Sequence, residues 1–166
     1  MGIDTLTVQE AVRRSIQIEK NAMDFYRLGA RKMQDADARR VFEILTGEER
    51  GHAATFYDVY TGTDIPSLDA FLDQPPHHES DWISALDRII ETGFNEQKAL
   101  ELAMSKEQQL EESMRKLTER ISDPKVKAVF ELNIRETHNH YLMIESEYAR
   151  VMGMVHESDM DIYVRE

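Results

Sequence analysis

Glu49 and His52 stand three residues apart and are the residues of this chain best suited to chemistry. Apolar residues recur around them at helical spacing, namely Val41, Ile44, Leu45, Phe56 and Val59. Residues three apart lie on one face of a helix, so the carboxylate and the imidazole point together into whatever that face covers. Burying both groups without polar partners is costly, and a metal ion is one partner that suits both. A Glu-x-x-His pair alone is a weak signal, because solvated helices contain it by chance.

Two more glutamates stand where a buried apolar seam is expected. Glu19 fills a gap in the apolar stripe that follows Ile16, and Glu107 lies in the stripe just before Leu110. A glutamate is almost never fully buried unless it is paired. A single glutamate at the edge of a seam would reach solvent. Glu19 and Glu107, however, occupy equivalent positions of the internal repeat described below, and this favours metal ligation. Tyr26 is expected to be a core residue, although its phenol, about two turns from Glu19, could also donate a hydrogen bond to a ligand.

An internal repeat connects these residues. Residues 11–60 align with residues 99–148 without a gap, at an offset of 88, with 10 identities in 50 positions. The matched residues include the pairs Glu19 and Glu107, His52 and His140, and Glu48 and Glu136. The sequence therefore predicts a duplicated helical pair that packs about a pseudo-two-fold axis, with these side chains at the centre of one bundle.

The second half of the repeat lacks one residue of the expected site. A carboxylate-bridged dimetal site in a bundle takes one Glu from each of two helices and a Glu-x-x-His from each of the other two. The repeat places Thr137 where the counterpart of Glu49 would stand. Glu136 shares roughly the face of His140 and is either a replacement carboxylate or a surface residue, and Glu111 is another candidate. The predicted metal ligands are Glu19, Glu49, His52, Glu107, His140 and Glu136.

The elements that position these residues are predicted to be all helical. Stripes at a spacing of three and four predict long helices at residues 5–33, 36–60, 94–121 and 124–152, and a short helix at about 81–92. Thr7, with Glu10 three residues later, predicts a capping box at the first helix. Gly153 is expected to end the last helix, and the acidic tail that follows is expected to be flexible or to dock on a neighbour.

The proline-rich connection at residues 61–80 is long for a compact domain and fits a crossover between the ends of a four-helix bundle. His77 and His78 in this connection are expected to be solvated. The chain of 166 residues is predicted to form one domain, built from two helical hairpins at about 5–60 and 94–152.

The composition excludes several classes of function. The formal net charge of −12 argues against a nucleic-acid or anionic-membrane partner and is compatible with a protein that attracts cations. Because the chain has no Cys, disulfides, thiolate metal sites, iron–sulfur clusters and cysteine nucleophiles are excluded. The first residues carry no basic apolar signal, and no run approaches the length of a membrane span, so a cytoplasmic protein is expected.

Two stretches of the chain resemble the helix patterns of one known family. Ile18–Tyr26 resembles its first-helix pattern, and Phe42-x-x-Leu45-x-x-Glu48-Glu49-x-x-His52 resembles its second-helix pattern. The family is that of the rubrerythrin-type members of the ferritin-like superfamily, and the resemblance covers about residues 5–152. The second half matches less well, and Met104 stands where rubrerythrin has an additional third-helix Glu. No rubredoxin-like domain can exist without Cys, so electrons are expected from an external donor.

The resemblance implies a ferritin-like bundle with a non-haem di-iron site that reacts with peroxide or dioxygen. It implies a peroxide reductase or a ferrous oxidase, and also a homodimer. The carboxylate missing at Thr137 predicts a site with metal positions of unequal affinity, or with one metal only. The donor set without thiolate also suits Mn, and Zn is a possible substitute. Thr137 keeps open an iron-handling protein without turnover. A partner-binding bundle with a degenerate site is a third hypothesis.

Overall fold

The computed structural model describes the backbone of residues 7–164 and the side chains of residues 7–153. All regular secondary structure in this part of the chain is helical, which confirms the all-α prediction. The six helices are α1 (Val8–Lys32), α2 (Ala36–Tyr57), α3 (Leu68–Leu72), α4 (Asp81–Thr92), α5 (Glu96–Thr118) and α6 (Pro124–Val164).

The long helices begin at side-chain caps, as the sequence predicts. Thr7 and Glu10 form the predicted capping box at α1, in which the Thr7 hydroxyl oxygen accepts from the Glu10 amide at 3.1 Å. Asp35 caps α2 by accepting from the amide of Ala38. Asp123, its counterpart in the repeat, accepts in the same way from the amide of Val126 at the start of α6.

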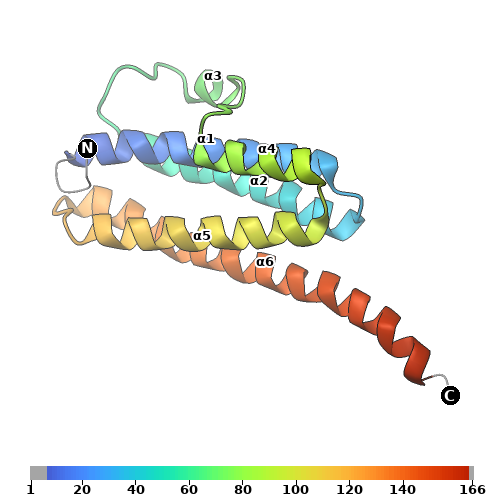
Figure 1. Cartoon of the computed structure of the whole chain (residues 1–166). Coiled ribbons are helices and arrows are strands. Elements are labelled where there is room, and N and C mark those ends of the chain that lie inside the picture. Colours follow the sequence, from blue (N-terminus) through green and yellow to red (C-terminus); the bar gives the residue numbers. More distant parts are fainter. Residues whose placement is uncertain (1–6, 165–166) are drawn as a thin grey trace.

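The four long helices form two hairpins, α1 with α2 and α5 with α6, and the hairpins meet where α2 packs against α6 (Figure 1). The short helix α4 packs against both α1 and α5 and so covers the seam between them. A continuous apolar core joins the hairpins, and its largest members include Phe42 and Phe130, which are fully buried and equivalent in the repeat. Burial of these faces drives bundle formation, since helix propensity alone is weak.

The structure contains one helix that the sequence did not predict, and its last helix ends later than predicted. The connection at 61–80 contains the five-residue helix α3, whose Leu72 packs with Met23 and Ala53. The predicted end of the last helix at Gly153 is wrong, because α6 continues to Val164 and extends beyond the other helices (Figure 1). A single glycine costs a helix only about 1 kcal/mol, and no proline follows to end it. The predicted start of the first helix at residue 5 falls outside the described residues.

The crossover is fixed to α1 by a buried lysine. Lys20 is only 2% exposed, and its ammonium donates to Asp24 at 2.6 Å and to the backbone carbonyl of Gln74 at 2.9 Å. Arg27 donates to the other carboxylate oxygen of Asp24 at 2.9 Å. A buried ion pair is stable only when its remaining hydrogen-bonding groups also have partners. The backbone carbonyl of Gln74 is such a partner for the Lys20 ammonium.

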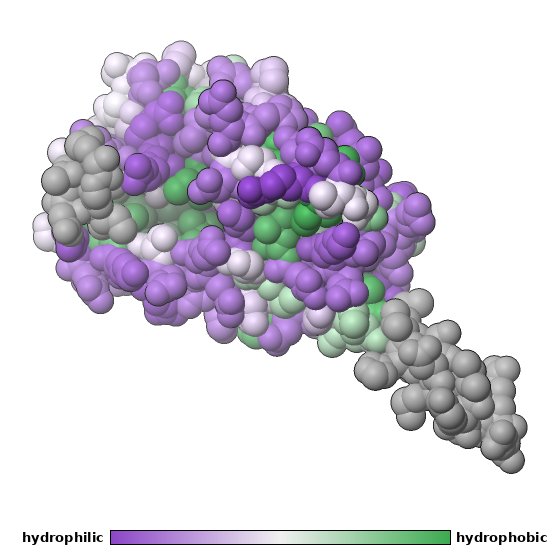
Figure 2. All heavy atoms as spheres, viewed as in Figure 1, coloured by the Kyte–Doolittle hydropathy of each residue, from purple (hydrophilic) through white to green (hydrophobic). Residues whose placement is uncertain are grey.

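Hydrophilic residues cover most of the face shown in Figure 2, and apolar residues emerge mainly along the seam between the upper helices and α5. Among the described residues, no helix combines the length and apolar character that crossing a membrane requires.

Candidate metal centre

Five of the six predicted ligands meet at the centre of the bundle. Glu19 comes from α1, Glu49 and His52 from α2, Glu107 from α5, and His140 from α6. None of these side chains is more than 3% exposed. The helical seams therefore carry the polar groups inward, as the stripe interruptions predict.

Glu49 lies between the two histidines. Its Oε1 is 2.8 Å from Nδ1 of His140, and its Oε2 is 3.4 Å from Nδ1 of His52. The imidazole rings stack at 4.8 Å between centroids, with 11° between their planes. Glu49, His52 and His140 each offer a ligand atom within 4.8 Å of the others. One carboxylate thus reaches both imidazoles.

The remaining two carboxylates are arranged as the repeat predicts. Oε2 of Glu19 lies 3.6 Å from Nδ1 of His52, and Oε1 of Glu107 lies 3.7 Å from Nδ1 of His140. Each half of the molecule therefore contributes one glutamate and one histidine to the cluster, and the distance between these two side chains is nearly the same in both halves.

The inward-facing atoms lack hydrogen bonds, and this tests whether the residues fit a metal. Within the described part of the chain, no hydrogen-bond partner satisfies a buried set of atoms: Glu19 Oε2, both oxygens of Glu49, Glu107 Oε2, Nδ1 of His52 and of His140, and Thr137 Oγ1. Buried polar groups are normally paired, because an orphaned one costs about 1–3 kcal/mol. Carboxylate oxygens and imidazole nitrogens that converge without partners fit divalent cations.

The site redistributes protons in the metal-free protein. Burial and the charge of Glu49 raise the pKa of Glu19 well above its ordinary value. Burial alone would raise the pKa of Glu49 too, but its contacts with Glu19 and both histidines outweigh it and hold the pKa well below the ordinary range. Burial and the charge of Glu49 raise the pKa of Glu107 to about 7.

The same carboxylates hold protons on the imidazoles. Burial would lower the pKa of both histidines, but the neighbouring carboxylates outweigh it. The pKa of His52 rises to about 12 and that of His140 to about 10. Both rings are therefore imidazolium cations, protonated on both nitrogens, at neutral pH when no metal is bound.

The outer nitrogens of the two histidines meet carboxylates of the opposite hairpin. Nε2 of His140 on α6 hydrogen-bonds Glu48 on α2. Nε2 of His52 on α2 lies 2.6 Å from Oε2 of Glu136 on α6, although the two are not aligned for a hydrogen bond. Each Glu thus stands four residues before the histidine of its own helix and contacts the histidine of the other. The repeat in the sequence pairs Glu48 with Glu136. That each of them contacts the histidine of the other hairpin depends on how α2 and α6 pack.

The sixth predicted ligand, Glu136, lies away from the inner cluster. Its side chain is 43% exposed and contacts Nε2 of His52, whereas Glu49 faces Nδ1. A ligand role for Glu136 stays a prediction. Glu111 does not reach the cluster in this structure, because its oxygens pair with His138 and Arg115 at 2.9 Å each.

Tyr26 and Thr137 complete the surroundings of the cluster. The hydroxyl of Tyr26 donates to Oε1 of Glu107 at 2.5 Å. This hydrogen bond joins α1 to α5, and it matches the alternative, considered from the sequence, that Tyr26 donates to a predicted ligand. Burial and the charges of Glu107 and Glu49 raise the pKa of the Tyr26 phenol, which keeps it a donor. Thr137 is fully buried at the position equivalent to Glu49.

A family model described as Rubrerythrin matches residues 10–148, which is most of the chain. The chain belongs to the rubrerythrin family. No curated protein and no solved structure matches the chain. Membership of the rubrerythrin family confirms the ferritin-like bundle, and it agrees with a metal site built from glutamate and histidine. The matched region contains all the residues that converge at the centre.

Sequence reasoning missed the buried ion pair of Lys20 and Asp24 in this rubrerythrin-family chain. The two residues are four apart on one helix, a spacing that often marks a surface pair. The signal for burial was the nearly complete apolar face around them, which includes Ala22, Met23 and Phe25.

Proposed function

We propose that this chain binds two metal ions at the centre of its bundle, with iron as the working metal, and reduces peroxide or oxidises ferrous iron. The observation that carries the proposal is the set of inward ligand atoms that have no hydrogen-bond partner among the described residues. Glu19 and His52 would hold one ion, Glu107 and His140 would hold the other, and Glu49 would be shared between them. Bound iron would supply two-electron redox chemistry that no side chain of this chain offers.

The protein residues orient and enclose this site. The Tyr26 hydroxyl fixes one oxygen of Glu107, which limits the rotation of that carboxylate. Burial of the ligands excludes bulk water and strengthens electrostatic interactions within the site. Thr137 is too short to replace a carboxylate, so one half of the site has one carboxylate ligand fewer, which weakens the cation position there. Unequal affinity of the two positions follows.

The test is anaerobic loading with Fe(II) followed by peroxide. We expect saturation at about two irons per chain and rapid oxidation seen by absorbance. A matched sample of Glu49→Ala protein, treated in the same way, separates protein-bound oxidation from that of free iron. Absence of rapid oxidation by wild-type protein loaded with iron would contradict the redox proposal.

Metal binding without turnover is the second candidate function, and Thr137 is the observation that favours it. It predicts tight binding of iron, manganese or zinc and no consumption of peroxide with any reductant. An external electron donor, a homodimer and a cytoplasmic location stay predictions.

A further inference from the structure

A groove between α2 and α6 lies over the ligand cluster. Glu48 and Gly51 of α2 line one wall, Glu136 and Asn139 of α6 line the other, and His52 and His140 also line it. These six residues form three pairs that are each 88 positions apart. The groove therefore lies on the pseudo-two-fold axis that relates the hairpins.

The two imidazole rings stand between this groove and the inner carboxylate. Each ring directs Nδ1 toward Glu49 and presents Nε2 to a half-exposed carboxylate of the groove, Glu48 or Glu136. His52 is only 3% exposed, lines the groove, and has no aligned hydrogen bond at Nε2. Its neighbour, Oε2 of Glu136 at 2.6 Å, is not aligned with it, so this nitrogen is a group that a cation in the groove can meet.

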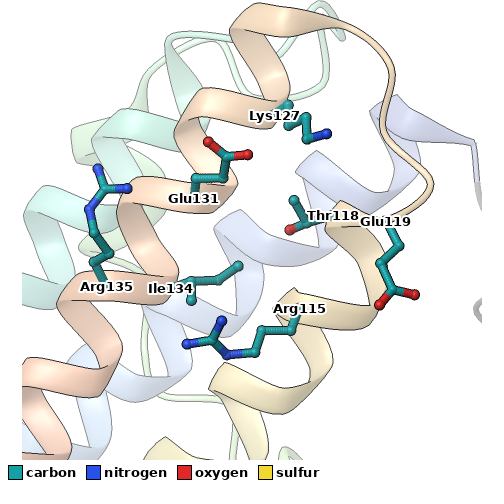
Figure 3. A pocket seen from close by; sticks show the side chains of 7 residues that line it. All are labelled: Arg115, Thr118, Glu119, Lys127, Glu131, Ile134 and Arg135. Carbon is teal, nitrogen blue, oxygen red and sulfur yellow. The ribbon is translucent and has the colours of Figure 1, made fainter.

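Charge distinguishes this groove from two others. A second groove lies between the last turns of α5 and the first turns of α6 (Figure 3). Its lining includes three cations, Arg115, Lys127 and Arg135, with Glu119 and Glu131. The groove of α1 and α2, its equivalent in the repeat, carries Arg27, Arg31 and Arg39 with Glu43. In contrast, the groove over the cluster has two carboxylates and no Lys or Arg among its lining residues. Glu48 and Glu136, each beside a histidine, are thus the carboxylate ligands that this groove offers to a divalent cation.

We propose that the groove between α2 and α6 is the route by which a hydrated divalent cation reaches the ligand cluster, with Glu48 and Glu136 receiving it first. This inference rests on the proposed metal binding and adds the path to it. At the rim, carboxylate oxygens replace some of the water molecules bound to the cation. The cation then passes the two histidines beneath the rim and reaches the inner ligands.

Two glycines of α2 give a matched experiment. Gly51 lines the groove, whereas Gly47 stands one turn earlier and does not. Both are exposed, and a Cβ added at either meets no atom within 4 Å. A helical side chain covers the turn before its own Cα, so Gly51→Phe places its ring over the Glu48 side of the groove, and Gly47→Phe places it further away. Both changes replace a glycine within a helix, so neither disfavours the fold.

The measurement is the rate of Co²⁺ binding to metal-free protein, followed by release into excess chelator. A blocked path slows association and dissociation by the same factor and leaves the dissociation constant unchanged, because an equilibrium does not depend on the path. We expect Gly51→Phe to slow both rates several-fold and Gly47→Phe to match wild type. Equal rates in the two variants would overturn the route, and so would a changed dissociation constant with unchanged association.

A second variant approaches from the opposite wall. Asn139→Phe on α6 should slow both rates as Gly51→Phe does, since Asn139 is the repeat counterpart of Gly51 and is also exposed. Glu48→Gln combined with Glu136→Gln should slow association about tenfold at low salt, and high salt should reduce the difference. If wild-type protein binds no Co²⁺ at equilibrium, the proposed function fails. If it binds normally and the Phe variants load at the wild-type rate, only the route fails.

Discussion

The hairpin of α1 and α2 and the hairpin of α5 and α6 build the same half-site, but only the first supplies the shared carboxylate. The distance from glutamate to histidine is 3.6 Å in one half and 3.7 Å in the other. Two of the differences between the halves concern the site: Thr137 corresponds to Glu49, and Met114 corresponds to Tyr26. Since Glu49 contacts both histidines, one central carboxylate serves both half-sites.

The largest effect is expected from removing the shared carboxylate. Glu49→Ala should abolish metal binding, because both histidines lose the oxygen they face, whereas Thr137→Ala at the equivalent position should leave metal content nearly unchanged. Metal analysis after dialysis against Co²⁺ or Zn²⁺ checks this. Equal metal content in Glu49→Ala and wild type would mean that the cluster is not the metal site and would favour the partner-binding bundle.

Acidity should weaken binding in both halves. In the metal-free protein the carboxylates raise the pKa of His52 to about 12 and of His140 to about 10, so both rings are protonated at pH 7. Coordination requires an unprotonated nitrogen, so each histidine that binds metal should release one proton, and Glu19 and Glu107, whose pKa values are also raised, should add to that release. Affinity should therefore rise with pH, by about tenfold per pH unit for each proton released. Calorimetry in buffers of different ionisation enthalpy counts the protons, and no release would contradict imidazole ligation.

Restoring the symmetry should have opposite effects on the metal-free and metal-bound protein. Thr137→Glu adds a carboxylate at a fully buried position, the repeat equivalent of Glu49, so we expect the metal-free protein to lose about 3 kcal/mol of stability. Metal should recover that loss and bind more tightly in the second half. Denaturant unfolding with and without metal measures both effects. Thr137→Gln has the same size without the charge, and an equal gain in metal affinity from it would show that charge is not the cause.

The smallest effect is expected from the second difference between the halves. Tyr26→Phe removes the hydrogen bond to Glu107 and should lower the stability of the metal-free protein by about 2 kcal/mol, since a buried carboxylate oxygen loses its donor. That hydrogen bond lowers the pKa of Glu107, so the variant should also raise it and weaken metal binding slightly at pH 7. Met114→Leu is the control at the equivalent position, where a volume-conserving change is tolerated. Equal loss in both variants would assign the effect to packing.

Much of the site was predictable because its residues violate the rules of a core. Glu19 and Glu107 interrupt apolar seams, and the repeat ties them to His52 and His140, so their burial and convergence were expected from the seams and the repeat together. The exchange of Glu48 and Glu136 between hairpins was not predictable, because it depends on which helices pack side by side. Helix α3 and the continuation of α6 through Gly153 were missed since a short helix depends on tertiary contacts and a glycine only weakly opposes a helix.

The anchoring of the crossover by Lys20 has a consequence for local unfolding. Gln74 cannot separate from α1 without leaving a buried ammonium short of a partner, next in sequence to Glu19. Opening of the crossover near Gln74 therefore costs the free energy of this buried hydrogen bond, and its backbone amides should resist hydrogen exchange more than those of an ordinary long loop. The least regular segment of the chain is thereby held against the helix that carries the first carboxylate.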